Sequence, residues 1–432
     1  MGFVEKRNVY RPATGEAPFG FDEIFFSRTD QRGVIECGNY VFKRVSDYDW
    51  GDLIGAPHKR IRHPDMPKGV FWLFWETLKA GEPIGAYVKN KARDGLYYWV
   101  YAVAMPFQGG FLSIRVKPAS DLFETIKQEY EVLRDAEENQ GLTPEESAAR
   151  LVQRIGELGY PDYRAFESDA LTRELAARDI KVNTKIDPEI KIFTEMAEAA
   201  SALKTETISL SDGFHAVSTV PTNMRIIASR LEPSGGAVSA LSQNYWSMSE
   251  EMAQWFRRYV TNSDSDFATM CDTLAECRFL LGMARMLREM STSFSLERRA
   301  LGDCDLKAEQ QQMVSLATIS TRKAMEGLNE VSEVALRISR AVAVMRRFTL
   351  GLSSTRVMCN IESARLSKGG ESLNYVITQL AGFQTNVDDQ LERIEDLSLS
   401  IQRNADALMA KGDGPKRRPP IKIKSNNREP SA

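Results

Sequence analysis

The sequence predicts an α+β domain, an antiparallel sheet with flanking helices, followed by an all-α elongated helical bundle or coiled coil. Two observations along the 432 residues support this division. Four of the six tryptophans lie in the first hundred residues, among short alternating runs of aromatic and β-branched residues. From about Ser120 onward the chain is rich in Ala, Leu, Glu, Met and Arg, which favour helices.

The front segment contains helical stretches first and strands afterwards. Short helices packed across an antiparallel sheet would form one domain with a cavity between sheet and helices. Glycine-containing turns separate the alternating runs, as in β-hairpins. The expected elements, in order, are helices over residues 39–53 and 68–79, and strands over residues 85–90, 96–103 and 111–116.

The second half contains two runs of apolar residues spaced three and four apart, a pattern that predicts helices with a narrow buried seam. An ordinary globular bundle is the alternative. The strongly polar positions between the seam residues favour the extended form. The two seams comprise Leu328, Val331, Ala335, Ile338, Val342 and Met345, and then Leu380, Phe383, Val387, Leu391 and Ile394.

Composition excludes several classes of protein. The formal net charge of −3 gives no electrostatic footprint for nucleic acid. No apolar run approaches the roughly 18–20 residues that cross a bilayer, and the N-terminus does not read as a signal peptide. The five cysteines are scattered and lack CxxC spacing, so we expect no disulfide framework or zinc site, as in a reducing cytoplasm. The sequence therefore predicts a soluble, cytoplasmic protein without a transmembrane segment.

Enzymatic motifs are missing from the sequence. It has no phosphate-binding loop, no nucleophile motif and no metal-ligand cluster. His215 is the only histidine beyond the front domain, and no ATP-binding glycine motif follows it, which argues against a histidine kinase. We therefore expect no catalytic activity and no metal site.

A run of specific residues in the front domain resembles the PAS domain of the bacterial aerotaxis receptor family, over about residues 20–118. The string around residues 62–67 is far more specific than general PAS likeness. One departure is Ile84, where the family commonly has a tryptophan. The matching residues are Gly55, Pro57, His58, Arg62, His63, Pro64, Asp65, Met66, Pro67, Phe71, Trp75, Leu78, Lys79, Gly81, Glu82, Pro83, Val88, Lys89, Asn90, Gly95, Tyr98, Trp99 and Val100.

The resemblance implies a non-covalently bound FAD whose redox state reports oxygen or respiratory state. Arg62 suits a phosphate or a flavin carbonyl, and Asn90 offers both a donor and an acceptor to a ring edge. The redox chemistry itself would belong to the cofactor. Carried over by position, the cofactor-associated residues are Arg62, His63, Asp65 and Asn90, with His58 and Trp75 lining or supporting the pocket.

Other interpretations of the same residues stay open. Arg62, His63 and Asp65 would equally cap and lock the turn before the helix that follows Pro67. The domain would then be empty or bind an unknown ligand. Haem bound through His58 or His63 is less favoured, because neither histidine lies on an obvious apolar helix face.

The helical half resembles the signalling helices of methyl-accepting chemotaxis receptors, although more weakly. Residues 223–232 and 360–366 are similar to the hairpin tip of those receptors, and each precedes a Gly-Gly pair at 235–236 or 369–370. The two segments resemble each other, which suggests an internal duplication. The long conserved string that follows the tip in ordinary chemoreceptors is absent. Two ordinary helix starts in a bundle are the alternative.

Together these features predict a soluble signal transducer that senses redox, oxygen or energy state and signals to chemotaxis or aerotaxis. We expect a homodimer, with chemotaxis kinase and coupling proteins as possible partners. The alternative is a cofactor-free PAS domain that mediates dimerisation in a scaffold protein. The predicted parts are an N-terminal segment (1–19), the PAS domain (20–119), a helical linker (120–190), the helical output region (191–410) and a basic, disordered tail (411–432).

Overall fold

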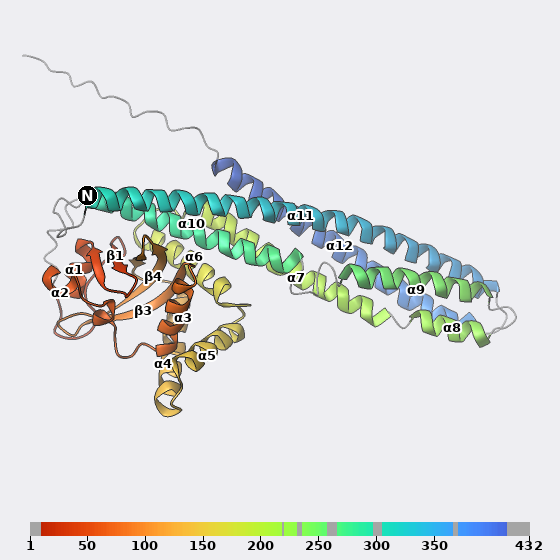
Figure 1. Ribbon diagram of the computed structural model, residues 1–432. Coiled ribbons are helices and arrows are strands. Elements are labelled where there is room, and N and C mark those ends of the chain that lie inside the picture. Colours follow the sequence, from red (N-terminus) through yellow and green to blue (C-terminus); the bar gives the residue numbers. More distant parts are fainter. Residues whose placement is uncertain are drawn as a thin grey trace, which may run out of the picture.

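The chain folds into a sheet-containing N-terminal domain beside a long helical bundle (Figure 1). This arrangement confirms the predicted fold class. The computed structural model describes residues 10–217, 220–230, 236–256, 266–296, 305–365 and 370–412. Residues 1–9 of the predicted N-terminal segment (1–19) lie outside these residues, as does the basic tail beyond residue 412.

The N-terminal domain is built on a five-stranded antiparallel sheet in the order β2-β1-β5-β4-β3. The sequence predicted the last three strands and missed the first two. A tight turn joins the missed pair: the Asp30 carboxylate accepts from the backbone N–H groups of Arg32 and Val34, and Gly33 adopts φ +75°. The strands are β1 (Ile24–Asp30), β2 (Ile35–Gly38), β3 (Ile84–Lys91), β4 (Tyr97–Phe107) and β5 (Gly110–Val116).

Short helices cover the inner face of the sheet. The predicted stretch over residues 39–53 is broken into two helices, because Asp47 takes a left-handed conformation with φ 60°. Asn39 fixes the first helix to β1: its side chain caps Phe42 N–H, accepts from Phe26 N–H and donates to Ile24 C=O. The helices are α1 (Tyr40–Ser46), α2 (Trp50–Leu53), the 3₁₀ turn η2 (His58–Ile61) and α3 (Lys68–Lys79), the last with the predicted bounds.

Later helices cover the outer face of the same sheet. Phe123 of α4 stacks on Tyr87 of β3, and Phe294 of α10 packs edge-to-face on Phe26 of β1. Helix α6 lies along the edge strand β3, which otherwise would expose unpaired backbone groups. These helices are α4 (Asp121–Asn139), α6 (Tyr163–Lys181) and α10 (Asp266–Leu296), whereas α5 (Pro144–Glu157) packs against α3.

The remaining helices complete an elongated bundle with four rows from one chain. In Figure 1, α7 and α8 run away from the N-terminal domain, α9 and α10 run back, and α11 and α12 repeat the excursion. All eleven predicted seam residues are buried on α11 and α12, as expected. The bounds are α7 (Pro188–Val217), α8 (Val220–Arg230), α9 (Gly236–Phe256), α11 (Leu306–Arg365) and α12 (Gly370–Gly412).

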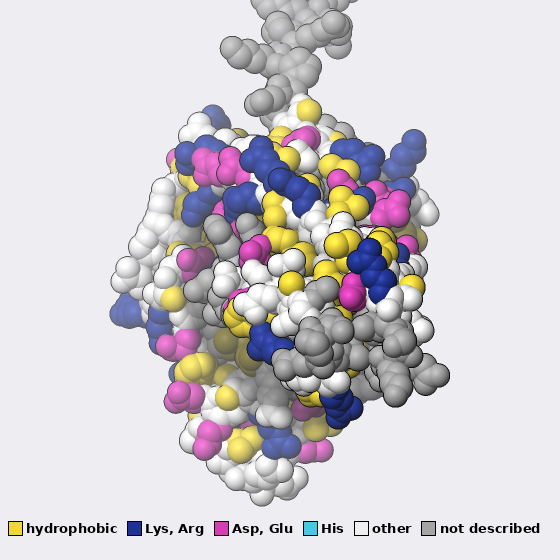
Figure 2. All heavy atoms as spheres, turned by 90° about the vertical axis from the view of Figure 1, so that its right-hand side faces the viewer, with side chains coloured by type: hydrophobic (Ala, Val, Ile, Leu, Met, Phe, Trp, Pro, Cys, Tyr) yellow, Lys and Arg dark blue, Asp and Glu magenta, His cyan; other side chains and the backbone are white. Residues whose placement is uncertain are grey.

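The two similar tip segments lie at the same end of the bundle, far from the sheet (Figure 1). In the first hairpin, the outward helices end with α8 and the returning helices begin at Gly236. In the second hairpin, the outward helix α11 is followed by α12, which begins at Gly370. Figure 2 looks onto this end, where hydrophobic side chains lie between basic and acidic ones. The chain thus forms two antiparallel hairpins, and the internal duplication stays a prediction. The turns themselves, residues 231–235 and 366–369, lie outside the described residues.

Cysteine pairing and hydropathy bear on two further predictions. Cys37 on β2 is disulfide-bonded, a single bond that the expectation of no disulfide framework did not include. Three other cysteines are free: Cys271, Cys277 and Cys359. Among the described helices, none combines the length and the apolar character that a membrane crossing needs.

A pair of leucines on α11 tests the seam. Leu328 is fully buried, whereas Leu350 on the same helix is 67% exposed. Leu328→Ala should lower the free energy of unfolding by about 2–5 kcal/mol, because it leaves a cavity among helices. Leu350→Ala, the matched control, should change it by less than about 0.5 kcal/mol. Urea unfolding followed by circular dichroism measures both; equal effects would contradict a seam buried within the chain.

Candidate functional site

A cavity of about 340 Å³ lies between the inner face of the sheet and the helices that cover it. Alternation along each strand decides which side chains line the cavity, because every second residue points to this face. Helix α3 and the turn η2 form the opposite wall. The lining residues include Ser27 and Thr29 from β1, Val88 and Asn90 from β3, Ala102 and Ala104 from β4, Ser113 and Arg115 from β5, His58, Arg62, Phe71, Phe74, Trp75 and Leu78.

Three polar groups on the sheet side of the cavity have no hydrogen-bond partner. They are the amide nitrogen of Asn90 and the hydroxyls of Ser113 and Thr29. These residues are only 2%, 8% and 6% exposed. Buried polar atoms in native proteins are nearly always paired, and each unpaired one carries a desolvation penalty. The cavity therefore offers a ready set of hydrogen bonds to a polar ligand.

Arg115 and His58 form a second polar group in the cavity. The Arg115 guanidinium donates to Ser27 Oγ at 3.0 Å and to His58 Nε2 at 2.8 Å. Because a guanidinium has only donors, Nε2 must be the unprotonated, accepting nitrogen of His58. The imidazole also stacks on the Phe42 ring. Burial, followed by the charge of Arg115, lowers the pKa of His58 to about 3, so the ring is neutral at physiological pH.

Aromatic side chains and Arg62 form the helix side of the cavity. The Arg62 guanidinium carbon lies 3.5 Å from the centroid of the Phe71 ring, a cation–π contact. The backbone of Arg62 pairs with that of Asn90, which brings two predicted site residues together. Trp75 packs edge-to-face on Phe111. Burial lowers the pKa of Arg62 to about 10, which leaves it charged at neutral pH.

The structure thus brings four of the six predicted residues, Arg62, Asn90, His58 and Trp75, to one cavity. His63 and Asp65 lie outside its lining. They form a turn network instead, in which Asp65 pairs with Lys89 at 2.5 Å and with His63 at 3.3 Å. This arrangement matches the alternative that these residues lock the turn before α3.

An open groove adjoins the cavity through the shared residues Pro57, Lys59 and Arg62. The groove is basic along its length and its lining contains no Asp or Glu. His63 belongs to this groove. Its basic residues are Lys59, Arg60, Arg62, Lys68 and Arg134.

Sequence reasoning missed Arg115, together with Ser27, Thr29 and Ser113. A signal was available for two of them, since Ser113 and Arg115 interrupt the predicted strand over 111–116 at alternate positions. A charged residue at such a position marks either a solvated face or a buried site. Ile84 points to the same face as Val88 and packs with Leu78 and Trp75 in a small apolar cluster. Trp75 therefore places an aromatic side chain beside Ile84, where the family commonly has a tryptophan.

These features define the class of the domain. Residues 38–112 match the family model described as the PAS fold. The strand order, the covering short helices and the enclosed cavity agree with that match. The N-terminal domain is a PAS domain, as predicted.

Two curated relatives identify its kind more closely. Over 147 residues the chain is 37% identical to the aerotaxis receptor of Escherichia coli (strain K12), covering 33% of this chain and 28% of the receptor. Over 107 residues it is 30% identical to the biofilm dispersion protein BdlA of Pseudomonas aeruginosa, covering 24% of this chain and 25% of that protein. The PAS domain is of the aerotaxis receptor family. The chain matches only about a quarter of the length of these relatives.

Solved structures add only a general likeness. A PAS domain from Colwellia psychrerythraea is 18% identical, with a TM-score of 0.21, and covers 22% of this chain and 85% of its own. A fungal LOV domain photoreceptor is 13% identical, with a TM-score of 0.19, and covers 23% of this chain and 75% of its own. Scores this low carry no argument about function.

His58 should remain neutral wherever the domain is folded. Because its pKa lies below the ordinary 6.5, its stabilising contribution is present above about pH 6.5 and declines as the pH falls towards 3. The imidazole NMR shifts of His58 should therefore not titrate between about pH 8 and pH 5. A midpoint near 6.5 in the folded protein would contradict the neutral, accepting role. His58→Asn, which cannot become charged, should be less destabilised by acid than the wild type.

Proposed function

We propose that the protein is a signal transducer in which the PAS domain binds FAD and reports redox, oxygen or energy state through the helical bundle to chemotaxis-type partners. The observation that carries the proposal is the set of unpaired polar atoms on the sheet side of the cavity, those of Asn90, Ser113 and Thr29. The named function of one relative, the aerotaxis receptor, supports the choice of signal.

The cavity suits a flat, polar ring system. Phe71 and Trp75 supply aromatic surface on one wall, and the sheet supplies unpaired hydroxyl and amide groups on the other. A volume of about 340 Å³ lies within the range typical of small-molecule sites. Asn90 would hold a ring edge by hydrogen bonds, since its amide nitrogen is free to donate.

The basic groove suits the diphosphate of the same cofactor. It leaves the cavity beside Arg62 and leads past Arg60 and Lys68 to solvent. Guanidinium groups bind phosphate oxygens in bidentate fashion, and the groove lining itself contains no carboxylate, although Arg134 pairs with Glu137 and Glu138 beside it. When bound, FAD would supply the electron-transfer chemistry, and the protein would set which redox form is held more tightly.

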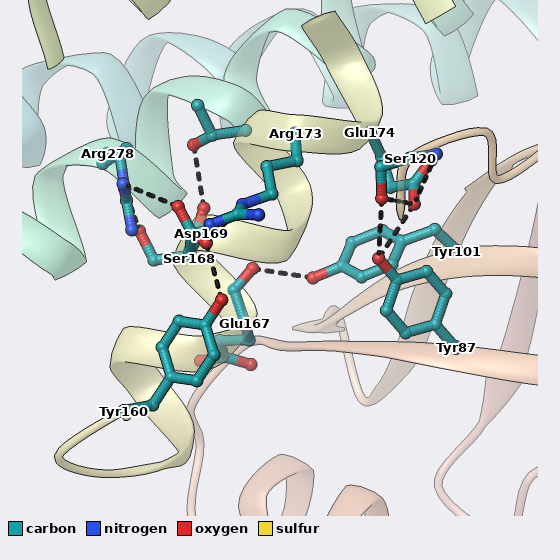
Figure 3. A network of polar contacts seen from close by, with 11 residues as sticks. Tyr87, Tyr101, Ser120, Tyr160, Glu167, Ser168, Asp169, Arg173, Glu174 and Arg278 are labelled. Carbon is teal, nitrogen blue, oxygen red and sulfur yellow. Dashed lines mark hydrogen bonds and ion pairs between the residues drawn. The ribbon is translucent and has the colours of Figure 1, made fainter. Parts of the chain in front are cut away.

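Direct contacts between the sheet and α6 would carry the signal onward (Figure 3). The Tyr87 hydroxyl donates to Glu174 Oε1 at 2.8 Å, and the Tyr101 hydroxyl donates to the Glu167 carbonyl at 2.7 Å. Glu174 also accepts from Ser120, the residue that precedes α4. One glutamate therefore joins a strand of the sensor domain, the start of α4 and helix α6.

The far side of α6 binds the bundle. Arg278 of α10 donates to Ser168 Oγ at 2.9 Å and pairs with Asp169 at 3.3 Å. A second link starts at the strand next to the cavity: Arg28 of β1 pairs with Glu309 of α11 at 2.8 Å. A rearrangement of the sheet would thus reach α10 and α11 without a flexible linker, which suits a two-state transmission.

The far end of the bundle is the proposed partner surface. Among the described residues, hydrophobic side chains are exposed there between charged ones (Figure 2). Docking of kinase and coupling proteins remains a proposal, as does the homodimer. The seams on α11 and α12 are buried within one chain, so self-association would have to use other surfaces. The exposed residues near the end are Ile226, Met358, Ile361 and Tyr375.

The visible spectrum of the purified full-length protein tests the cofactor. We expect a flavin spectrum and the release of FAD on denaturation. Arg62→Ala and Asn90→Ala should each weaken FAD binding about tenfold or more, because each leaves a ligand group without its partner. Asp65→Ala is the matched control and should retain FAD, because its side chain lies outside the cavity.

A colourless protein that stays colourless after incubation with FAD would refute the flavin proposal. The cofactor-free scaffold would then be the better description. Flavin content that is unchanged in Arg62→Ala and Asn90→Ala would instead refute only the assignment of the pocket.

The junction between sheet and α6 predicts a specific dependence on pH. Glu167 Oε2 accepts from the Gly85 N–H at 2.7 Å, and burial raises the pKa of Glu167 to about 8. Because the pKa of Glu167 is higher in the folded than in the unfolded protein, its stabilising contribution is fully present below about pH 4.5. This contribution is lost as the pH rises through 8. The free energy of unfolding should therefore fall between about pH 5 and pH 8.

Glu167→Gln imitates the protonated carboxyl and should remove that part of the fall. Urea unfolding at several pH values measures it. Glu157→Gln, an exposed glutamate on α5, is the control and should keep the wild-type slope. Identical slopes in all three proteins would contradict a protonated Glu167 at the junction.

A further inference from the structure

The charges that line the cavity all have one sign. Arg32, Lys59, Arg62 and Arg115 belong to its lining, and no Asp or Glu does. Arg32 is exposed at the rim, where solvent screens its charge. Arg115 is different, because it lies near the end of β5, the central strand of the sheet, and is only 5% exposed.

Arg115 has only neutral partners. Its guanidinium donates to a serine hydroxyl, Ser27 Oγ, and to the neutral imidazole of His58. Among the ion pairs of the described residues, none includes Arg115. Burial lowers the pKa of Arg115 to about 10, so it still carries its charge at neutral pH.

Other buried arginines in this chain are paired with carboxylates. Arg44 pairs with Glu23 at 2.6 Å, Arg278 pairs with Asp169 at 3.3 Å, and Arg178 pairs with Glu289. A buried charge without a counter-charge is costly, which is why such pairing is the rule. Within the described part of the chain, Arg115 has no paired carboxylate. It faces the cavity, where a ligand can supply the missing negative charge.

We propose that Arg115 is the anion-binding group of the cavity, which holds the electron-rich edge of the ligand and binds an anionic form more tightly than a neutral one. His58 orients the guanidinium by accepting one of its hydrogen bonds, and its ring adds no second positive charge. Any small ligand with a carboxylate or another anionic edge meets this requirement. The inference rests on the proposed function only in its application to FAD.

For a flavin, the proposal has a redox consequence. Addition of two electrons and one proton to the oxidised ring leaves one net negative charge, whereas a second proton makes the ring neutral again. Arg115 should favour the singly protonated, anionic reduced ring. The bound cofactor would then be easier to reduce than it would be without Arg115, and the reduction would be coupled to the Arg115–Ser27 contact on β1.

The first experiment measures the midpoint potential of bound FAD by dye-coupled reductive titration of the full-length protein. Arg115→Gln should weaken the preference for reduced over oxidised FAD about tenfold, a fall of about 30 mV for two electrons. Arg115→Lys, which keeps the charge but not the planar fork, should fall less. Arg93→Gln removes an exposed arginine of the same domain and should leave the potential unchanged.

A potential in Arg115→Gln equal to that of the wild type, with FAD still bound, would overturn the Arg115 proposal and leave the flavin proposal standing. Thermal unfolding of each variant shows whether the domain is folded. If Arg115→Gln does not fold, the comparison rests on Arg115→Met, which also removes the charge and should lower the potential by about 30 mV. An unchanged potential in Arg115→Met, with FAD still bound, would overturn the Arg115 proposal.

A second experiment does not depend on flavin. If the wild type binds no FAD, the flavin proposal fails, and small carboxylates become the probes. Acetate, succinate and benzoate are compared with sodium chloride of equal ionic strength by thermal unfolding of the full-length protein. At least one carboxylate should raise the Tm of the wild type and not that of Arg115→Gln. No rise with any of them, or an equal rise in both proteins, would overturn the proposal.

Discussion

The need to bury both faces of one five-stranded sheet governs the whole molecule. The outer face carries large side chains such as Phe26, Tyr87 and Tyr101, which are fully buried only because α4, α6 and α10 cover them. Covering helices therefore come from the second half of the chain as well as the first. Gly85 marks the closeness of this contact, since a Cβ there would lie 2.4 Å from the Tyr101 hydroxyl and 3.0 Å from Phe279 of α10. The PAS domain and the bundle share one core as a result.

Polar groups on the two faces of the sheet differ in whether they have hydrogen-bond or ionic partners. On the outer face, the buried carboxylates of Glu167 and Glu174 accept hydrogen bonds from the sheet and from the start of α4. On the inner face, Asn90 and Ser113 keep unpaired atoms, and Arg115 has no counter-charge. A satisfied network adds specificity to a fold, whereas unsatisfied groups cost stability and are retained where a ligand uses them. Under the proposed function, the outer face would transmit the signal and the inner face would bind the ligand.

The apolar seams of the bundle are buried by helices of the same chain. A seam residue such as Leu328 requires apolar neighbours from other helices, and α10 and α12 provide them for α11. Ion pairs between the rows add lateral contacts, for example Arg346 with Glu395 at 2.9 Å. Two hairpins in one polypeptide thus form the four-row arrangement that the apolar pattern requires, and no second copy is needed to bury the seams.

The sequence by itself determined the features that depend on local pattern. The alternation in β3, β4 and β5, the bounds of α3 and the apolar seams follow from side-chain periodicity, which a single segment already displays. The cavity residues Arg62 and Asn90 came from a resemblance carried by a short, specific string. Only the tertiary structure decided that Asp65 faces away from the cavity, that Arg115 faces into it without a counter-charge, and that α6 bridges sheet and bundle. These facts depend on contacts between segments that are far apart in the sequence, and the periodicity within one segment does not encode such contacts.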